Sequence, residues 1–424
     1  MRVLVINTTE RQGGPAIAAF RLTEALKANG IQAKMLVREK ETDRVTTIQA
    51  ERTLADRLSV IRERATIGIH NRLKAPHRYL LHSGSSGSDI TRLPEFRQAD
   101  VIHLHWVNDG MLSLAMLRRI LDSGKPVVWT LHDMWPFTGI CHYAHECDDY
   151  RTHCHNCFQL NSGSSRDLSY RVFERKRQLL QSSHISRIRF VTCSHWLETM
   201  ARDSALLEGQ PVSCIPNAVP TSIFFPHPRK TCRESLRLPQ DRRLILFSSQ
   251  FVGDRRKGYT YLTEALRRLV ANDSQWRDNL GVVVIGRDAD RVAAEPIAVP
   301  VYPMAYLSDE RHIAEVINAC DLLCIPSLQD NLPNTVVEAM ACGLPCVGFE
   351  VGGIPEMIDH LHNGYIANYK DPDSLAEGIR WILTDGDYSI LSSEALRKAR
   401  TAYSETSVAS QYINVYNALT GKHE

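Results

Sequence analysis

The chain of 424 residues is long enough for two or three domains of ordinary size. Hydrophobic residues make up 43% of it and charged residues 23%, a balance typical of globular proteins in water. The formal net charge of +2 excludes a protein that binds nucleic acid through an overall positive charge. No apolar run approaches the roughly 20 residues of a membrane-spanning helix, and the apolar start MRVLVI is too short for the core of a signal peptide.

The cysteines indicate a reducing compartment. There are eleven, and an odd number argues against a complete disulfide framework. Because free thiols persist in reducing surroundings, we expect a cytoplasmic protein. Six cysteines stand singly in or beside apolar segments, where they act as small buried hydrophobic residues: Cys193, Cys214, Cys320, Cys324, Cys342 and Cys346.

Short apolar runs alternate with helical patterns along the whole chain. Runs that are apolar on both faces and separated by helices are typical of parallel sheets covered on each side. Two such series predict an α/β protein with two Rossmann-like, doubly wound parallel-sheet domains. The predicted strands are 2–7, 33–38, 101–106, 126–131, 189–193 and 212–216 in the first series, and 243–248, 281–286, 299–304, 321–326 and 344–349 in the second.

The predicted boundary between the two domains is IPNAVPTSIFFPHPRK at 215–230. This segment is rich in proline and has no periodicity, so it is expected to be a linker. We therefore expect an N-terminal domain over 1–220 and a C-terminal domain over 226–404. The spacing of apolar residues also predicts a helix within 405–424.

The first predicted strand leads into a glycine turn and a helix. Gly13 and Gly14 precede Pro15, which suits a first helical turn because its missing donor would be unpaired there anyway. The glycines let the backbone approach a ligand, and a helix N-terminus favours an anion such as a phosphate. A tight βα turn without a ligand is the alternative, and the spacing is not the G-x-G-x-x-G of dinucleotide oxidoreductases.

The most informative stretch is CIPSLQDNLPNTVVEAMACGLPCVGFEVGGIPEMI at 324–357. A strand ends, a polar loop follows, and a helix is expected from near Asn334 to Ala341. Ligands of open α/β sheets bind at the carboxyl ends of strands. Asp330 in the loop and Glu338 one turn inside the helix are able to face the same crevice. Unpaired backbone amides at the helix start could hold a diphosphate, namely those of Asn334, Thr335 and Val336.

This stretch resembles the family 4 glycosyltransferases of the GT-B fold. That family carries an E-x₇-E pattern here, followed by A-x-A-x-G-x-P-V and G-G-x-x-E, and this chain has DNLPNTVVE, AMACGLPCV and GGIPE. SHWLETM at 194–200 and IPNAV at 215–219 also match family positions. The departure is Asp330, where the family usually has glutamate. Aspartate is one methylene shorter, so its contact with a sugar, or the sugar chosen, stays open.

The resemblance implies a role for each matching residue. The residue at 330 would bind hydroxyls of the donor sugar, and Glu338 would bind the ribose of the nucleotide. In FVGDRRKGYTYL, Lys257 and a second cation, Arg256 or Arg255, would neutralise the diphosphate leaving group. The alternatives are a loop cap and a solvated helix residue for the two carboxylates, and a solvated basic turn for the cations.

The resemblance also points to His132, in WTLHDMWPF at the end of a predicted strand. Similar family members have a histidine here that meets the donor sugar across the cleft. The alternative is a structural histidine that bonds a loop carbonyl. Asp133 could orient this imidazole or serve as an acceptor-side carboxylate. His103 and His105 alternate on one strand and share a face, where packing is favoured over a role near the acceptor.

The resemblance further implies a retaining transfer of a sugar from a UDP- or GDP-sugar to a saccharide or lipid-linked acceptor, in cell-surface polysaccharide biosynthesis. No cofactor is needed for catalysis, since basic residues and helix amides take the place of a metal. The last helix would cross back to the first domain. Two alternatives stay open: a GT-B nucleotide-sugar epimerase, and a catalytically weak sugar-nucleotide-binding module.

The remaining four cysteines form a cluster with the spacing C-x₅-C-x₆-C-x₂-C: Cys141, Cys147, Cys154 and Cys157. Four thiolates could close a tetrahedral structural zinc site and hold together a loop with few apolar residues. Such a site leaves no open position, which argues against a catalytic zinc. Only the final C-x₂-C has the usual ligand spacing, so paired or free thiols are the alternative.

Two segments, 52–82 and 169–190, are basic with interleaved aliphatic residues. Such segments contact anionic lipid, where a lipid-linked acceptor would lie, or they pack as amphipathic helices with a solvated basic face. Packing is favoured for 169–190, and both interpretations stay open for 52–82. Peripheral contact with the inner face of the plasma membrane is therefore one expectation.

Overall fold

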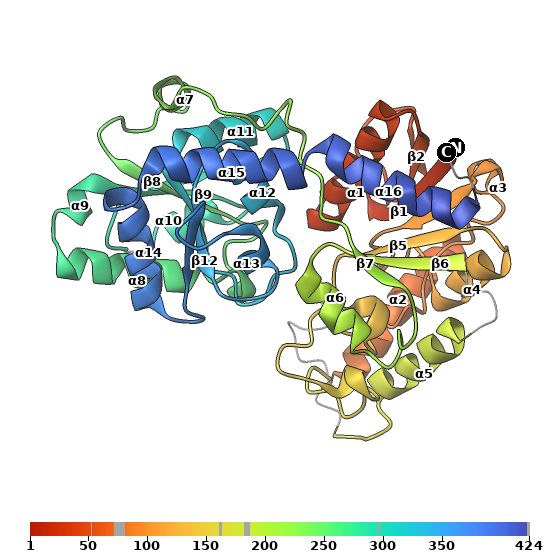
Figure 1. Ribbon diagram of the computed structural model, residues 1–424. Helices are drawn as coiled ribbons and strands as arrows, with labels where there is room; N and C mark the ends of the chain where they lie inside the picture. The colour runs from red at the N-terminus through yellow and green to blue at the C-terminus, as the bar shows by residue number, and fades with distance from the viewer. Residues whose placement is uncertain (52, 72–80, 161–162, 182–186, 296, 422–424) are drawn as a thin grey trace. The chain divides into compact units, whose positions relative to one another are not determined.

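The computed structural model describes residues 1–51, 53–71, 81–160, 163–181, 187–295 and 297–421 (Figure 1). The chain divides into two compact units. The first unit comprises Met1–Pro216 together with Val408–Glu424, and the second comprises Asn217–Ser407. Each unit contains one parallel sheet with flanking helices, so the predicted fold class of two Rossmann-like sheets is confirmed.

The first unit is built on a seven-stranded sheet in the order β3-β2-β1-β4-β5-β6-β7. Val3 of β1 lies opposite Ala33 on one side and Val101 on the other, so the central strand has parallel neighbours on both sides. The short edge strand β3 was not predicted, because three residues cannot show a period. The strands are β1 (Arg2–Thr9), β2 (Gln32–Glu39), β3 (Thr47–Gln49), β4 (Val101–Leu104), β5 (Val127–Leu131), β6 (Ile188–Thr192) and β7 (Val212–Cys214).

The helices of the first unit are α1 (Gly14–Ala28), α2 (Leu54–His70), α3 (Pro94–Gln98), α4 (Leu114–Asp122), α5 (Leu168–Leu180) and α6 (His195–Arg202). They are joined by α16 (Glu405–Thr420), which belongs to this unit from Val408 onward (Figure 1). The Tyr416 hydroxyl lies 2.6 Å from His103 Nδ1 of β4, and the Tyr412 hydroxyl lies 2.9 Å from Thr130 Oγ1 of β5. The last helix is thus held to the sheet by buried side-chain hydrogen bonds.

The second unit contains a six-stranded sheet in the order β10-β9-β8-β11-β12-β13. Val282, Val283 and Val284 of β9 are all fully buried, as expected for a strand covered on both faces. The four-residue edge strand β13 was not predicted. The strands are β8 (Arg243–Ser248), β9 (Leu280–Ile285), β10 (Val301–Met304), β11 (Leu322–Ile325), β12 (Cys346–Phe349) and β13 (Gly364–Ala367).

The helices of the second unit are α7 (Arg229–Ser235), α8 (Tyr259–Asn272), α9 (Trp276–Asn279), α10 (Ala289–Ala293), α11 (Glu310–Ala319), α12 (Asn334–Ala341), α13 (Ile354–Met357), α14 (Pro372–Thr384) and α15 (Tyr388–Ala402). Most of the segment expected to be a linker packs within this unit. Phe224 is 1% exposed, and the Val219 amide donates to the Tyr403 carbonyl at 2.8 Å. The apolar side chains between the prolines therefore belong to a core.

Candidate functional site

The carboxyl ends of β8 and β11 position the candidate site of the second unit. The strand order reverses between these two neighbouring strands, and open α/β sheets bind ligands at such a switch point. β8 continues into a loop that ends at α8, and β11 continues into a loop that ends at α12. The structure therefore brings together the two loops that carry Lys257 and Asp330.

The backbones of these two loops touch each other. The Leu328 amide donates to the Arg256 carbonyl at 2.7 Å, and the Arg256 guanidinium donates to the Gln329 carbonyl at 2.7 Å. Gly258 has a φ of +72°, and a Cβ at this position would lie 1.8 Å from the Pro326 carbonyl oxygen. Only glycine fits there, so the glycine after Lys257 is required for the contact between the loops.

Asp330 pairs with both cations of the neighbouring loop. Its Oδ2 lies 2.5 Å from Lys257 Nζ and 3.5 Å from Arg256 Nη1, and the Ser327 hydroxyl donates to the same oxygen at 3.2 Å. Burial raises the pKa of the Asp330 carboxyl, but the charges of Lys257 and Arg256 outweigh it and hold the pKa below its ordinary value. Asp330 is therefore a carboxylate, and its position between the loops does not fit a simple loop cap.

We call Arg256, Lys257 and Asp330 the cation–aspartate cluster. Arg256 reaches Asp330, whereas the Arg255 side chain is exposed, so Arg256 is the second cation of this cluster. Its role toward a diphosphate stays a prediction. The Asp254 side chain caps this turn by accepting from the Arg256 amide at 2.9 Å. The Asp254 carboxylate lies 3.6 Å from Arg256 Nη2, and Arg255 adds a third cation to the turn. The three cations and two carboxylates leave a net charge of +1, which suits an anionic ligand.

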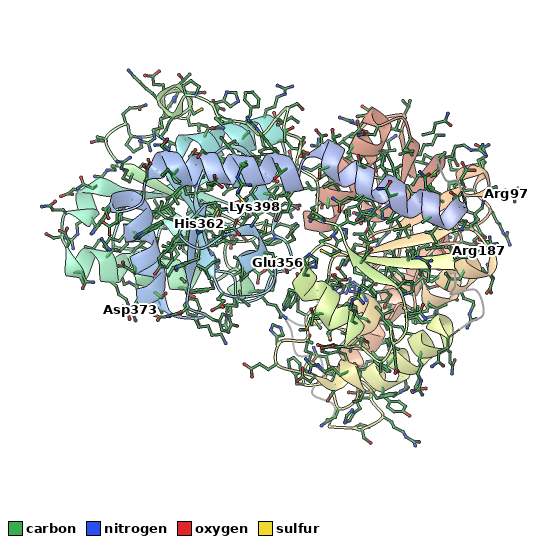
Figure 2. All side chains as sticks on the ribbon, viewed as in Figure 1. Arg97, Arg187, Glu356, His362, Asp373 and Lys398 are labelled. Atoms are coloured by element: carbon green, nitrogen blue, oxygen red, sulfur yellow. The ribbon has the colours of Figure 1, made fainter. Side chains whose placement is uncertain are left out.

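The glycine pair of the G-G-I-P-E motif holds the backbone of Asp330. The Gly353 amide donates to the Asp330 carbonyl at 3.2 Å. Gly352 has a φ of +62°, and a Cβ there would lie 1.8 Å from the same carbonyl oxygen. The motif then continues into α13, which carries Glu356 (Figure 2). Three segments that are separate in the sequence thus fix the position of one carboxylate.

Helix α12 begins at Asn334 after Pro333, with no side-chain cap on its first turn. The prediction of an unpaired amide is wrong for Val336, whose N–H donates to the Pro333 carbonyl at 3.0 Å. The reason is that the helix opens with a tight i→i−3 turn. Asn334 and Thr335 remain the residues that open the helix, where a helix N-terminus favours anions.

Asn217 is a site residue to which the sequence analysis assigned no role. Its side-chain amide donates to Asn334 Oδ1 at 3.0 Å and thereby fixes the first residue of α12. The sequence signal for this residue was its place in IPNAV, which matches a family position. That match could not indicate a contact with a residue 117 positions later in the chain.

Glu338 lies in α12 and is 4% exposed. A solvated helix residue, the alternative considered for this position, does not fit this burial. Burial raises the pKa of the Cys342 thiol, and the Glu338 charge raises it further, so this carboxylate lies near a buried cysteine one turn along the helix. The assignment of Glu338 to the ribose of a nucleotide stays a prediction.

His132 follows β5 in the first unit. Its Nε2 lies 2.9 Å from His105 Nδ1, and its Nδ1 lies 3.5 Å from Cys193 Sγ. Burial lowers the pKa of His132 to about 4, although the charge of Asp133 raises it in part. The imidazole is therefore neutral near pH 7, and both of its nitrogens lie within hydrogen-bond distance of protein groups in this structure.

A small polar cavity lies beside His132. Among the described residues, His105 Nε2 and Asn108 Oδ1 are buried and have no hydrogen-bond partner. Both residues line a cavity with room for about one water molecule. A hydroxyl or a water placed there would satisfy both atoms. The other lining residues are Trp106, Val107, Trp129, Thr130, Asp133, Trp135 and Pro136.

Asp133 is paired with His142 instead of His132. Its Oδ2 lies 2.7 Å from His142 Nδ1, and its Oδ1 accepts from the Trp135 amide at 2.9 Å. His142 Nε2 in turn lies 2.7 Å from His82 Nδ1. The structure thus gives Asp133 a role in holding a buried chain of imidazoles, with both of its oxygens engaged.

Gly13 and Gly14 open α1 in the first unit. Gly13 has a φ of +89° and provides no side-chain cap. A Cβ on Gly13 would meet no atom within 4 Å, so its backbone conformation, and not crowding, requires glycine. The turn leaves open space, and the predicted phosphate contact stays a prediction.

The cysteine cluster lies on one loop of the first unit, and all its thiols are unpaired: Cys141, Cys147, Cys154 and Cys157. Burial raises the pKa of Cys141 to about 11 and that of Cys157 to about 12. The Gly139 amide donates to Cys154 Sγ at 3.2 Å. Within the described ranges, no three of these sulfurs lie within 4.8 Å of one another. The structure gathers the cysteines on the loop without closing a tetrahedral site.

The two basic segments have different environments. In the described part of the chain, no helix is sufficiently long and apolar to cross a bilayer. Helix α5, which covers the first half of the segment 169–190, buries Val172, Phe173 and even Lys176, whose ammonium donates to the Thr138 carbonyl at 3.0 Å. Packing therefore explains this helix. Residues 182–186, Arg52 and 72–80 of the two segments lie outside the described residues.

The fold and site define a two-sheet GT-B protein with a cluster suited to an anion. A family model described as glycosyltransferase family 4 matches residues 12–223, and one described as glycosyl transferases group 1 matches residues 242–385. The first match alone spans half of the chain, and the chain belongs to glycosyltransferase family 4. Both matches support a transferase enzyme.

Curated relatives are similar over parts of their length. N-acetyl-alpha-D-glucosaminyl L-malate synthase of Bacillus anthracis is 30% identical over 112 residues, which cover 26% of this chain and 29% of the relative. The putative colanic acid biosynthesis glycosyl transferase WcaC of Escherichia coli K12 is 23% identical over 327 residues, 75% of each chain. Alignments with the first curated relatives span between 29% and 50% of those proteins.

Solved structures have the same fold along the whole chain. Sucrose-phosphate synthase from Thermosynechococcus elongatus has a TM-score of 0.68 at 17% identity, with 100% of each chain covered. Anabaena HepE, solved in complex with UDP-glucose, has a TM-score of 0.61 at 15% identity, with 99% of this chain and 100% of that chain covered. These similarities confirm the predicted GT-B fold.

Proposed function

We propose that this protein is a retaining glycosyltransferase that moves a sugar from a nucleotide-sugar donor to a saccharide or lipid-linked acceptor. The observation that carries the proposal is the cation–aspartate cluster at the switch point of the second unit. Its net positive charge lies beside the start of α12, where the helix also favours an anion. A nucleoside diphosphate is a ligand of the right charge for this place.

The proposed chemistry uses the cluster in two ways. As the bond between sugar C1 and the β-phosphate oxygen breaks, Arg256 and Lys257 stabilise the charge that develops on the phosphate. The acceptor oxygen forms the new bond to C1 on the same face, and its proton passes to the leaving phosphate. A bound diphosphate gives Lys257 a second anionic partner, which leaves the Asp330 oxygens able to accept hydrogen bonds from sugar hydroxyls.

The proposal assigns donor binding to the second unit and acceptor binding to the first. In the first unit, neutral His132 would exchange its contact with Cys193 Sγ, at 3.5 Å, for a sugar hydroxyl. The cavity beside it adds His105 Nε2 and Asn108 Oδ1, which have no hydrogen-bond partner within the described residues. The donor is a UDP- or GDP-sugar, and the UDP-glucose complex of HepE supports this class. The name of WcaC, a putative colanic acid biosynthesis glycosyl transferase, supports a role in cell-surface polysaccharide biosynthesis. We further propose that this chain acts in the cytoplasm, at the inner face of the plasma membrane.

The test is to incubate the protein with a panel of UDP-, GDP- and ADP-sugars without added metal. Binding is measured as a shift in Tm, and reaction is measured as release of nucleoside diphosphate. A donor at 100 times its Kd stabilises the folded state by about 2.7 kcal/mol. For a domain of about 200 residues this raises Tm by about 5–10 °C. We expect one base to give such a shift, and the shift to be lost in Glu338→Ala.

Glu377→Ala is the matched control, because this exposed carboxylate lies on α14 in the same unit, where it pairs with Arg380. It should keep the full shift. A sugar product that forms without acceptor and without release of diphosphate would instead identify an epimerase. A folded sample that responds to no sugar nucleotide would refute the transferase proposal and favour a binding module.

A further inference from the structure

His105 and Asn108 share the small polar cavity beside His132 in the first unit. His105 directly follows β4 and is 3% exposed, and Asn108 follows in the same loop and is 4% exposed. Within the described part of the chain, His105 Nε2 and Asn108 Oδ1 have no hydrogen-bond partner. Both residues line the cavity, which has room for about one water molecule. Two buried polar atoms that each require a hydrogen bond thus meet in one small space.

The backbone fixes both residues at the carboxyl edge of the sheet. The His105 amide donates to the Ile6 carbonyl at 2.9 Å, and the Trp129 indole donates to the His105 carbonyl at 3.2 Å. The Thr8 hydroxyl donates to the Asn108 carbonyl at 2.7 Å. These bonds tie the two residues to β1 and β5, so neither can leave the cavity without breaking hydrogen bonds to a neighbouring strand.

The contacts of Cys193 decide which nitrogen of His132 carries the proton. The Cys193 thiol donates to the Leu131 carbonyl at 3.6 Å, and a carbonyl can only accept. Because the single thiol hydrogen is engaged there, the sulfur faces His132 Nδ1, 3.5 Å away, as an acceptor. Nδ1 is therefore the protonated nitrogen of this neutral imidazole, and its Nε2 accepts a hydrogen bond.

The same reasoning extends from His132 to His105. Since His132 Nε2 accepts, His105 Nδ1, 2.9 Å away, carries a hydrogen and donates to it. Burial lowers the pKa of His105 well below its ordinary value, so this imidazole is neutral and its Nε2 is an acceptor. Asn108 Oδ1 is a carbonyl oxygen and also accepts. The cavity therefore contains two acceptors, which cannot bond each other, whereas one water molecule has two O–H groups and satisfies both.

We propose that His105 and Asn108 are positioning residues that hold His132 in its Nδ1–H tautomer through a water molecule bound between His105 Nε2 and Asn108 Oδ1. Asn108 accepts one hydrogen of the water and so turns the other hydrogen toward His105. Without this donor, a bare His105 Nε2 would be buried unpaired, which disfavours the tautomer. A sugar hydroxyl could enter only with its ring, for which the cavity has no room.

The Nδ1–H tautomer makes His132 a hydrogen-bond donor. Sulfur is a weak acceptor, so the oxygen of a sugar hydroxyl can replace Cys193 Sγ as the partner of Nδ1. In the other tautomer Nδ1 would be an acceptor and would bind the hydrogen of a hydroxyl instead. The step to the sugar rests on the proposed function, whereas the tautomer and the bound water do not.

The first test is NMR of the full chain with ¹⁵N-labelled histidine, because the ¹⁵N shifts of an imidazole distinguish its two tautomers. The two signals are assigned by their loss in His132→Gln and in His105→Gln. We expect Nδ1–H tautomers of both rings in the wild type. A crystal structure should show one water within about 3 Å of both His105 Nε2 and Asn108 Oδ1. An Nε2–H tautomer of His132, or a cavity without this water, would overturn the proposal.

Two substitutions of Asn108 separate its acceptor oxygen from its volume. Asn108→Leu should exclude the water and give a His132 signal that averages both tautomers. Its kcat/KM for sugar transfer should fall roughly five- to tenfold, as for loss of one hydrogen bond between neutral groups. Asn108→Asp keeps an oxygen that accepts from the water, so it should keep the wild-type tautomer. The spectrum of the wild type decides the proposal even if Asn108→Leu does not fold.

Ser204→Ala is the matched control in the same unit. The buried Ser204 hydroxyl donates to the Phe137 carbonyl at 2.8 Å, outside the cavity. This variant should lose Tm but keep the wild-type His132 signal and kcat/KM. Persistence of the wild-type tautomer in Asn108→Leu would overturn the proposal. If the tautomers respond as expected but no sugar nucleotide reacts, the transferase proposal fails and the positioning of His132 stands.

Discussion

Asparagine in place of Asp330 removes the negative charge between Lys257 and Arg256, and leaves Asp254, 3.6 Å from Arg256 Nη2, as the remaining carboxylate beside the arginine. Loss of one partner from a fully buried ion pair costs about 3–5 kcal/mol, since the other charge is left uncompensated. The Lys257 and Arg256 side chains keep 19% and 25% of their surface exposed, so water screens them in part. We therefore expect Asp330→Asn to lower the free energy of unfolding of the second unit by about 2–3 kcal/mol. That corresponds to a fall in Tm of about 4–12 °C.

A nucleoside diphosphate should reverse part of this loss. If the two cations hold a diphosphate, the ligand replaces the missing negative charge in the variant, whereas in the wild type it competes with Asp330 for Lys257. The stabilisation by UDP or GDP, whichever binds, should then be larger in Asp330→Asn than in the wild type. Sugar transfer should fall in the variant, because the carboxylate that accepts from sugar hydroxyls is gone.

The assay is thermal unfolding of wild type, Asp330→Asn and Asp373→Asn, each with and without the nucleoside diphosphate. Asp373 is a matched control on α14 (Figure 2), since its side chain is 74% exposed in a surface pair with Arg268, which is worth about 0–1 kcal/mol. If Asp330→Asn unfolds at the wild-type temperature, or if its deficit is the same with and without the diphosphate, the reasoning about these cations is wrong.

Three further predictions concern other parts of the chain. Gly258→Ala places a Cβ 1.8 Å from the Pro326 carbonyl oxygen, so it should lower the free energy of unfolding, measured in urea, by about 3 kcal/mol or more. Gly209→Ala is the control: with open space around it, it should lower this free energy by only about 1 kcal/mol. The pKa of His132 is about 4 in the folded chain and about 6.5 when unfolded, so the unfolded state binds the proton first as pH falls. Stability should be lost between about pH 6.5 and pH 4, by up to about 3 kcal/mol, and Tm measured against pH should fall less steeply in His132→Gln. A structural zinc in the cysteine cluster stays a proposal, and it requires the four sulfurs to move closer together than they lie here, where no three are within 4.8 Å of one another. If zinc binds, metal analysis should find about one zinc per chain, which Cys154→Ser should lose together with several degrees of Tm. A metal-free wild type with full stability would contradict this.

The sequence by itself determined the features that depend on local pattern. Buried strands of two parallel sheets are continuous apolar runs, so eleven of the strands could be predicted from hydrophobicity alone. Helix α12 starts at Asn334 and ends at Ala341 as predicted, because Pro333 and Gly343 bound it on its two sides. The family also follows from the sequence, because its motifs are short segments with fixed spacing. The edge strands β3 and β13 could not be predicted, since three or four residues show no period.

Only the tertiary structure decided which side chains meet. Lys257 and Asp330 are 73 residues apart and pair because β8 and β11 are neighbours in the sheet. Asp133 pairs with His142 and not with its chain neighbour His132. The order of residues along the chain does not show which of the two histidines the carboxylate contacts. The periodicity of α2 shows two faces but not which one is buried. Glu63 finds its partners in the loop at Ser83, and Ile67, one turn further along, packs in a buried cluster, so these side chains define the buried face of α2.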